Sequence, residues 1–129
     1  MQDFGNRKQM SIEARNQAES VVPRVFLAVE SLCVGNGDVR DRLLVAITDL
    51  LPLQSSDFPE HLRKDFEWVI NQSTKYESPY PEFYGQLEAT MKRIKNSTGS
   101  KIAKRILHIY SEIQNIRGFP LLEYRDPNE

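Results

Sequence analysis

FYGQLEATMKRIKNSTGSKIAKRILHIYSEIQNIR, residues 83–117, carries apolar side chains at every third or fourth position, with Thr98 as the one polar member of the pattern. The average spacing is about 3.7 residues, which is the period of one face of an α-helix. Gly99 lies in the middle of the pattern, and glycine costs a helix about 1 kcal/mol relative to alanine. We therefore expect one long helix over about 82–117, with a break near Gly99 as the alternative. The pattern consists of Phe83, Leu87, Met91, Ile94, Thr98, Ile102, Ile106, Ile109, Ile113 and Ile116.

The length of this helix bears on the shape of the molecule. About 35 helical residues span roughly 50 Å, whereas a compact domain of this chain length is about 36 Å across. An unbroken helix would make the molecule elongated or would leave an overhang for a second chain to cover. A break at Gly99 would instead give a compact bundle of five helices.

Two further helices are predicted in the first 51 residues. The first begins at Ser20, because Pro23 fits only the first turn of a helix and Ser20 can cap that turn. Residues 11–19 could add a kinked leading segment. The second helix covers 39–51, with Asp38 as its N-cap after a glycine-containing turn.

Another helix opens near Phe58. Asp57 and Glu60 stand three residues apart, which is the spacing of a capping box. Its apolar stripe consists of Leu62, Phe66, Val69 and Ile70. The next position in the same spacing is the polar Ser73, so this helix should end before 78–81. No segment alternates apolar and polar residues as a half-buried strand does, so the fold class is all-α, a helical bundle of four to five helices.

Composition indicates one small domain. The chain has 129 residues, of which 40% are hydrophobic, with 17 basic residues against 18 acidic ones and a single cysteine. This balance excludes histone-like and polyacidic proteins, and the lone cysteine excludes an internal disulfide framework. We expect a mobile N-terminus over 1–10, a single helical domain over 11–129 and an irregular tail from about 118. Because no segment resembles a secretion signal or a membrane span, we expect a cytoplasmic protein.

Residues suited to catalysis or metal binding are few. His61 and His108 are the only histidines, and neither has a second histidine or a cysteine nearby. Cys33 falls near the end of a helix, where the helix dipole disfavours a thiolate, so we expect it to be a small buried apolar residue. We expect His61 to be solvated and His108 to flank the core. The sequence predicts neither a metal nor a cofactor, and no catalytic activity.

Charge is distributed unevenly along the chain. No acidic residue lies between Glu88 and Glu112. The basic residues of this interval could contact the phosphates of a nucleic acid or an acidic partner protein. Acidic residues within 57–67 or in the tail 123–129 could instead neutralise them within the fold. The six basic residues are Lys92, Arg93, Lys95, Lys101, Lys104 and Arg105.

Aromatic and apolar residues also gather in two segments with turn-forming prolines or glycine. Such residues either plug the ends of a bundle or dock on a partner, because tyrosine buries area at low entropic cost. They are Tyr76, Tyr80, Phe83 and Tyr84 in the first segment, and Phe119, Leu121 and Leu122 in the second.

Three runs of residues are similar to a set of short uncharacterised bacterial helical proteins. They are GDVRDRLL at 37–44, DFPEHLRKDFEW at 57–68 and RIKNSTGSKIAKRI at 93–106. The resemblance covers roughly residues 30–115. It implies a small bacterial cytoplasmic protein and brings no catalytic residues with it.

These observations favour a small non-catalytic helical protein-interaction module. It would be an accessory or regulatory subunit of a larger bacterial assembly, or a homodimer joined along the last helix. The alternative is a helical protein that binds nucleic acid without base specificity, using the basic residues of 92–105 for phosphate contacts.

Overall fold

The computed structural model describes residues 2–78 and 83–121, with side chains described for 12–78 and 85–121. Throughout these residues the secondary structure is helical, without a strand. This confirms the predicted all-α bundle. The helices are α1 (Gln2–Val34), α2 (Val39–Leu50), α3 (Arg63–Ser73), α4 (Phe83–Arg93) and α5 (Asn96–Arg117), with short 3₁₀ turns at Ser55–Asp57 and Glu60–Leu62.

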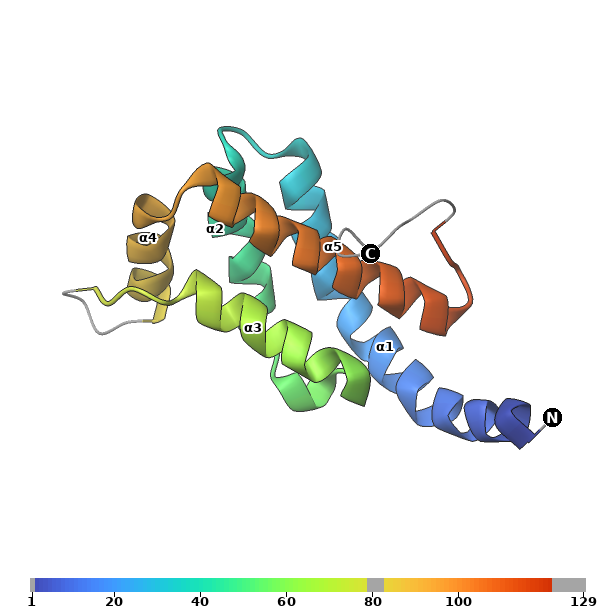
Figure 1. The fold of residues 1–129 in the computed structure, drawn as a ribbon. Helices are drawn as coiled ribbons and strands as arrows, with labels where there is room; N and C mark the ends of the chain where they lie inside the picture. The colour runs from blue at the N-terminus through green and yellow to red at the C-terminus, as the bar shows by residue number, and fades with distance from the viewer. Residues whose placement is uncertain (1, 79–82, 122–129) are drawn as a thin grey trace.

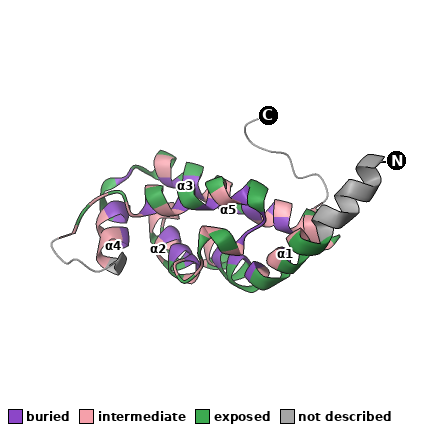
Figure 2. Cartoon of the chain, turned by 90° about the horizontal axis from the view of Figure 1, so that it is seen from below, coloured by how far each residue is buried: buried purple, intermediate pink, exposed green. Residues whose placement is uncertain are grey.

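The helices form two layers. α3 and α5 lie on one side, α1 and α2 lie on the other, and α4 closes one end (Figures 1 and 2). α1 packs against both α2 and α5, while α2 also contacts α4. Aliphatic side chains from all five helices, together with Phe58 and Leu62, fill the space between the layers. No helix in the described parts of the chain is both long and apolar enough to cross a bilayer.

α1 differs from the prediction. It begins at Gln2, not at Ser20, and continues through Pro23 to Val34. Proline supplies no N–H to the carbonyl of Glu19, and both residues are exposed on the surface of the helix. The buried side of the helix offsets the cost of the proline, about 3 kcal/mol, by packing into the core. That side includes Ala18, Val21, Val25 and Ala28.

The turn into α2 follows the prediction. Oδ1 of Asp38 accepts hydrogen bonds from the backbone N–H groups of Arg40 at 2.9 Å and Asp41 at 3.2 Å. Asp41 in turn accepts from the backbone N–H of Asp38 at 3.1 Å, which completes a capping box. Gly37 has φ 87°, a left-handed conformation that suits glycine.

α3 begins at Arg63, so the prediction of a start near Phe58 was wrong. The carboxylate of Asp57 accepts a hydrogen bond from the backbone N–H of Gln54 at 2.8 Å and thereby closes a 3₁₀ turn. It does not cap the helix. Phe58 is buried, and its ring stacks on that of Phe66 with centroids 4.5 Å apart. The polar and aromatic residues that suggested a helix start therefore shape the turns before it.

The prediction of one helix over 82–117 was also wrong, because the chain breaks at Ile94 and Lys95. Lys95 is extended, with φ −80° and ψ 159°. The alternative of two helices is the one observed, but the break lies four to five residues before Gly99, which is itself buried in the first turn of α5. A Cβ atom on Gly99 would lie 2.9 Å from Cγ1 of Val39 and 3.4 Å from Cδ1 of Leu43. The glycine therefore allows α5 to approach α2 closely.

Candidate nucleic-acid interface

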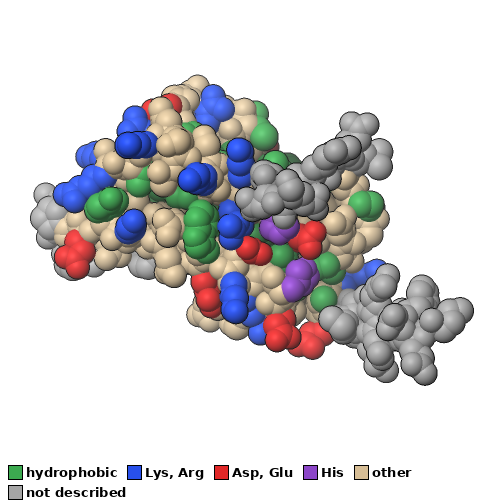
Figure 3. Space-filling model, in the orientation of Figure 1, with side chains coloured by type: hydrophobic (Ala, Val, Ile, Leu, Met, Phe, Trp, Pro, Cys, Tyr) green, Lys and Arg blue, Asp and Glu red, His purple; other side chains and the backbone are tan. Residues whose placement is uncertain are grey.

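The basic residues predicted from the sequence gather where α4 meets α5. Figure 3 shows Lys and Arg side chains spread over this end of the molecule, whereas the two histidines lie among acidic residues toward the other end of α5. We call the exposed group the basic face. Its members are Lys92, Arg93, Lys95, Lys101 and Lys104.

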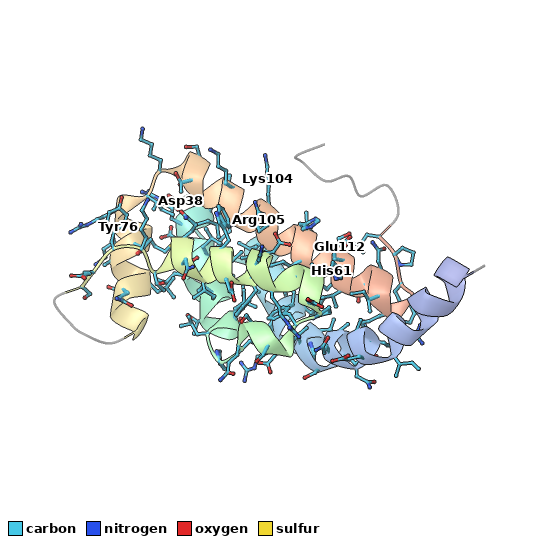
Figure 4. The ribbon with its side chains drawn as sticks, turned by 60° about the horizontal axis from the view of Figure 1, so that its bottom comes forward. Asp38, His61, Tyr76, Lys104, Arg105 and Glu112 are labelled. Carbon is cyan, nitrogen blue, oxygen red and sulfur yellow. The ribbon has the colours of Figure 1, made fainter. Side chains whose placement is uncertain are left out.

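Few local contacts neutralise the basic face. Nζ of Lys92 lies 3.2 Å from Oε1 of Glu88, but the Lys92 side chain is 74% exposed and remains accessible to a ligand. The guanidinium of Arg93 lies over the ring of Tyr76, 5.2 Å from its centroid. Lys101 and Lys104 have no ion-pair partner within the described ranges, and Lys104 projects from α5 away from the bundle (Figure 4).

The start of α5 adds to the positive potential. Lys95 occupies the N-cap position without a side-chain hydrogen bond, and the first turn contains no acidic residue. The first backbone N–H groups of a helix lack intrahelical partners and form the positive end of the helix dipole. Asn96, Ser97 and Ser100 are exposed there and supply further hydrogen-bond donors. In α2, by contrast, the carboxylate of Asp38 already occupies the corresponding position.

Arg40 holds the corner between α4 and α5 in place. Its Nη1 donates to the carbonyl oxygen of Ile94 at 3.2 Å, and its Nη2 lies 2.9 Å from Oδ2 of Asp38. The hydrogen bond from the Arg40 guanidinium is the main reason why the pKa of the Asp38 carboxyl lies below its ordinary value of 3.8. The same pair raises the pKa of Arg40. An ionised pair on α2 therefore anchors the segment that presents the basic face.

Arg105 is the one predicted cation that the structure places elsewhere. Its Nη1 donates to Oδ1 of Asp65 on α3 at 3.0 Å, and its guanidinium lies 4.5 Å from the centroid of the Trp68 ring. The Arg105 side chain is only 28% exposed. Arg105 therefore joins α5 to α3, and the interface with a ligand would be built from the other five residues.

Each histidine lies beside a carboxylate group. Nε2 of His61 lies 3.4 Å from Oε1 of Glu112, and these two side chains face each other in Figure 4. Nε2 of His108 lies 4.0 Å from Oδ2 of Asp65. Within the described residues, no group of three or more His, Cys, Asp or Glu side chains is arranged to hold a metal ion.

Cys33 corrects another expectation, because it is exposed and not buried. The core-facing stripe of α1 passes through Ala28, and Leu32 packs at its edge. Cys33 is the next residue along the helix and is turned about 100° away from that stripe.

Of the predicted docking residues that the structure describes, Tyr76 and Phe119 lie near opposite ends of α5. Tyr76 packs against the core beside α4, and its backbone N–H donates to Oγ1 of Thr90 at 2.9 Å. Phe119 is exposed beyond the opposite end of α5, after Gly118 with φ 89°. Leu121 is half-buried. Tyr80 and Leu122 lie outside the described residues, as do the side chains of Phe83 and Tyr84.

Sequence reasoning missed an apolar surface on α1. Phe26, Leu27 and Val34 are exposed there, and Val45 of α2 is exposed as well. The signal was present in residues 21–34, VVPRVFLAVESLCV, where apolar residues occur on every side of the helix. Only one side of an amphipathic surface helix is expected to be apolar.

Comparison with known proteins gives no further guide to function. The chain matches no protein-family model, no curated protein and no solved structure. The resemblance over residues 30–115 therefore assigns no family.

Proposed function

We propose that this protein is a small non-catalytic helical protein that binds the phosphate backbone of nucleic acids through the basic face. The observation that carries this proposal is the gathering of five exposed cations around the uncapped start of α5. Lysine and arginine side chains, serine hydroxyls and helix N-termini are the groups that contact phosphates in protein–nucleic acid complexes.

Among the described side chains of 85–105, the lack of large exposed apolar residues favours a nucleic acid over an acidic protein partner. Between residues 85 and 105, the described side chains include no large exposed hydrophobic residue. Protein–protein interfaces are organised around an apolar centre with a polar rim, whereas phosphate contacts need only cations and hydrogen-bond donors. The basic face therefore favours a polyanionic backbone as its ligand.

Binding should depend little on sequence and strongly on salt. Lysine acts as a flexible point charge, without the planar geometry that reads base edges. Each phosphate neutralised contributes about −0.9 to the slope of log K against log salt, so four to five contacts predict roughly a 10²-fold to 10³-fold loss of affinity between about 50 and 200 mM salt.

Fluorescence anisotropy with labelled single-stranded and double-stranded oligonucleotides tests the proposal. The variant Lys101→Glu/Lys104→Glu should lose most of its affinity, because both residues are exposed members of the basic face. The matched control Arg15→Glu/Lys64→Glu changes the net charge equally at exposed positions on α1 and α3. Equal losses in both variants, or affinity that ignores salt, would contradict the proposal.

A second candidate function is a protein-interaction module, either a subunit of a larger assembly or a homodimer. The exposed apolar surface of α1 favours it. Location in a bacterial cytoplasm belongs to the same proposal; it is supported by the single cysteine, which suits a reducing compartment, and by the resemblance over 30–115.

A further inference from the structure

The second half of α1 exposes apolar side chains on the side that faces away from the core. Val21, Val25 and Ala28 are buried, whereas Leu27 is 42% exposed and Val34 is 74% exposed. Figure 2 shows exposed turns along the side of α1 that faces away from α3. A helix that is apolar all round is normally covered on all sides, so this outer side of α1 lacks a partner.

α2 extends the same apolar surface. Nη1 of Arg24 lies 3.4 Å from the carbonyl oxygen of Asp49, which places these two residues opposite each other in the antiparallel α1–α2 pair. Leu27 is about one turn after Arg24, and Val45 is about one turn before Asp49. Leu27 and Val45 therefore come from facing turns, and both are exposed.

The charges beside Leu27 indicate which partner fits. Arg24 and Glu30 are exposed and stand three residues before and three residues after Leu27. In the described part of the chain, neither side chain forms an ion pair. A two-fold axis at Leu27 would lay two α1 helices antiparallel, with Arg24 opposite Glu30 of the partner subunit. Each contact would then occur twice, as in an isologous interface.

The outer residues lie along one side of α1. Steps of three and four residues connect them, which places all of them on the same face of the helix. This row extends over about 21 Å of helix. Its members are Ser20, Pro23, Leu27, Glu30 and Val34.

We propose that this outer side of α1, over residues 20–34, is a homodimer interface in which two copies of the chain pack antiparallel about Leu27. The interface lies on α1 and not on the last helix, where the sequence suggested it. It goes beyond nucleic-acid binding and does not depend on it, because the basic face at the α4–α5 corner stays accessible in both copies.

Sedimentation equilibrium of the full chain at concentrations up to about 100 μM tests the proposal, since even a weak specific interface is populated there. The wild-type protein should be a dimer. Leu27→Asp should be a monomer, because it brings two carboxylates together across the two-fold axis. The matched control Leu107→Asp should remain a dimer, because Leu107 is 39% exposed, like Leu27, but lies on α5.

Charge reversal tests the register and remains decisive even if Leu27→Asp fails to fold. Arg24→Glu should weaken dimerisation at least tenfold, and adding Glu30→Arg should restore it. Residues six apart on one helix do not face each other, so the rescue reports a contact between two chains. A wild-type monomer at about 100 μM, dissociation by Leu107→Asp alone, or absence of rescue would overturn the proposal. Lys101→Glu/Lys104→Glu should stay dimeric, which separates this test from that of nucleic-acid binding.

Discussion

Replacing Gly99 with alanine should destabilise the protein, although alanine is the better helix former. Helix propensity alone would stabilise α5 by about 1 kcal/mol. The added Cβ would lie 2.9 Å from Cγ1 of Val39, a contact that forces the branched side chain or the α2–α5 spacing to shift. Overpacking of this kind costs about 1–3 kcal/mol. With a cost near the middle of that range, the free energy of unfolding should fall by about 1 kcal/mol.

A double-mutant cycle isolates the steric contribution. In a Val39→Ala background the nearest obstructing atom is absent, so Gly99→Ala should raise the free energy of unfolding by about 1 kcal/mol relative to Val39→Ala alone. Urea titrations followed by far-UV circular dichroism measure each corner of the cycle. Ser100→Ala is the control, because this exposed neighbour changes propensity without packing. Stabilisation by Gly99→Ala in the wild-type background would refute the close approach of α5 to α2.

Three further predictions concern single residues. Asp38→Ala should lower the urea midpoint more than Asp38→Asn, because asparagine keeps a capping oxygen. The pKa of Asp38 in the folded state lies below 3.8, so the stability that its carboxylate contributes is present above that pH and is lost as the pH falls further. In an acid titration, Asp38→Asn should therefore flatten the loss of stability in this pH range. Gly118→Ala should cost about 1 kcal/mol in urea titrations because of its φ of 89°, and Gly118→Asn should cost less. Arg105→Ala should cost about 1 kcal/mol, whereas Lys104→Ala should change the urea midpoint hardly at all; equal effects would contradict the contact between Arg105 and α3.

The apolar periodicity predicted the fold class because it reports directly which faces are buried. Ile102, Ile106 and Ile109 are all buried, as the spacing requires. The apolar spacing does not reveal the helix break at Lys95, because Ile94 before the break and Ile102 after it are both buried. The sequence also could not predict that α1 continues through Pro23, because tertiary packing offsets the cost of a proline inside the helix.

The sequence predicted that basic residues would gather in this part of the chain, but not which of them would be exposed. The interval without acidic residues indicated a concentration of positive charge, and the structure exposes Lys101 and Lys104. Arg105 stands three residues after Ile102 and four before Ile109, so it shares a face with core positions. That spacing pointed toward the interior, but only the placement of α3 shows that Asp65 and Trp68 receive the side chain.

The hydrogen bond from Arg40 to the carbonyl of Ile94 has a consequence for how the basic face assembles. Local periodicity favours a straight helix through Ile94, and the bend is held by a residue 54 positions earlier in the chain. A contact of such sequence separation carries the entropy cost of closing a long loop, so the rest of the fold must hold its two partners together. A peptide of residues 83–117 lacks Arg40, so its positive charges would lie at different positions relative to one another. The arrangement of the basic face is therefore a property of the folded domain, because it depends on a contact with the first turn of α2.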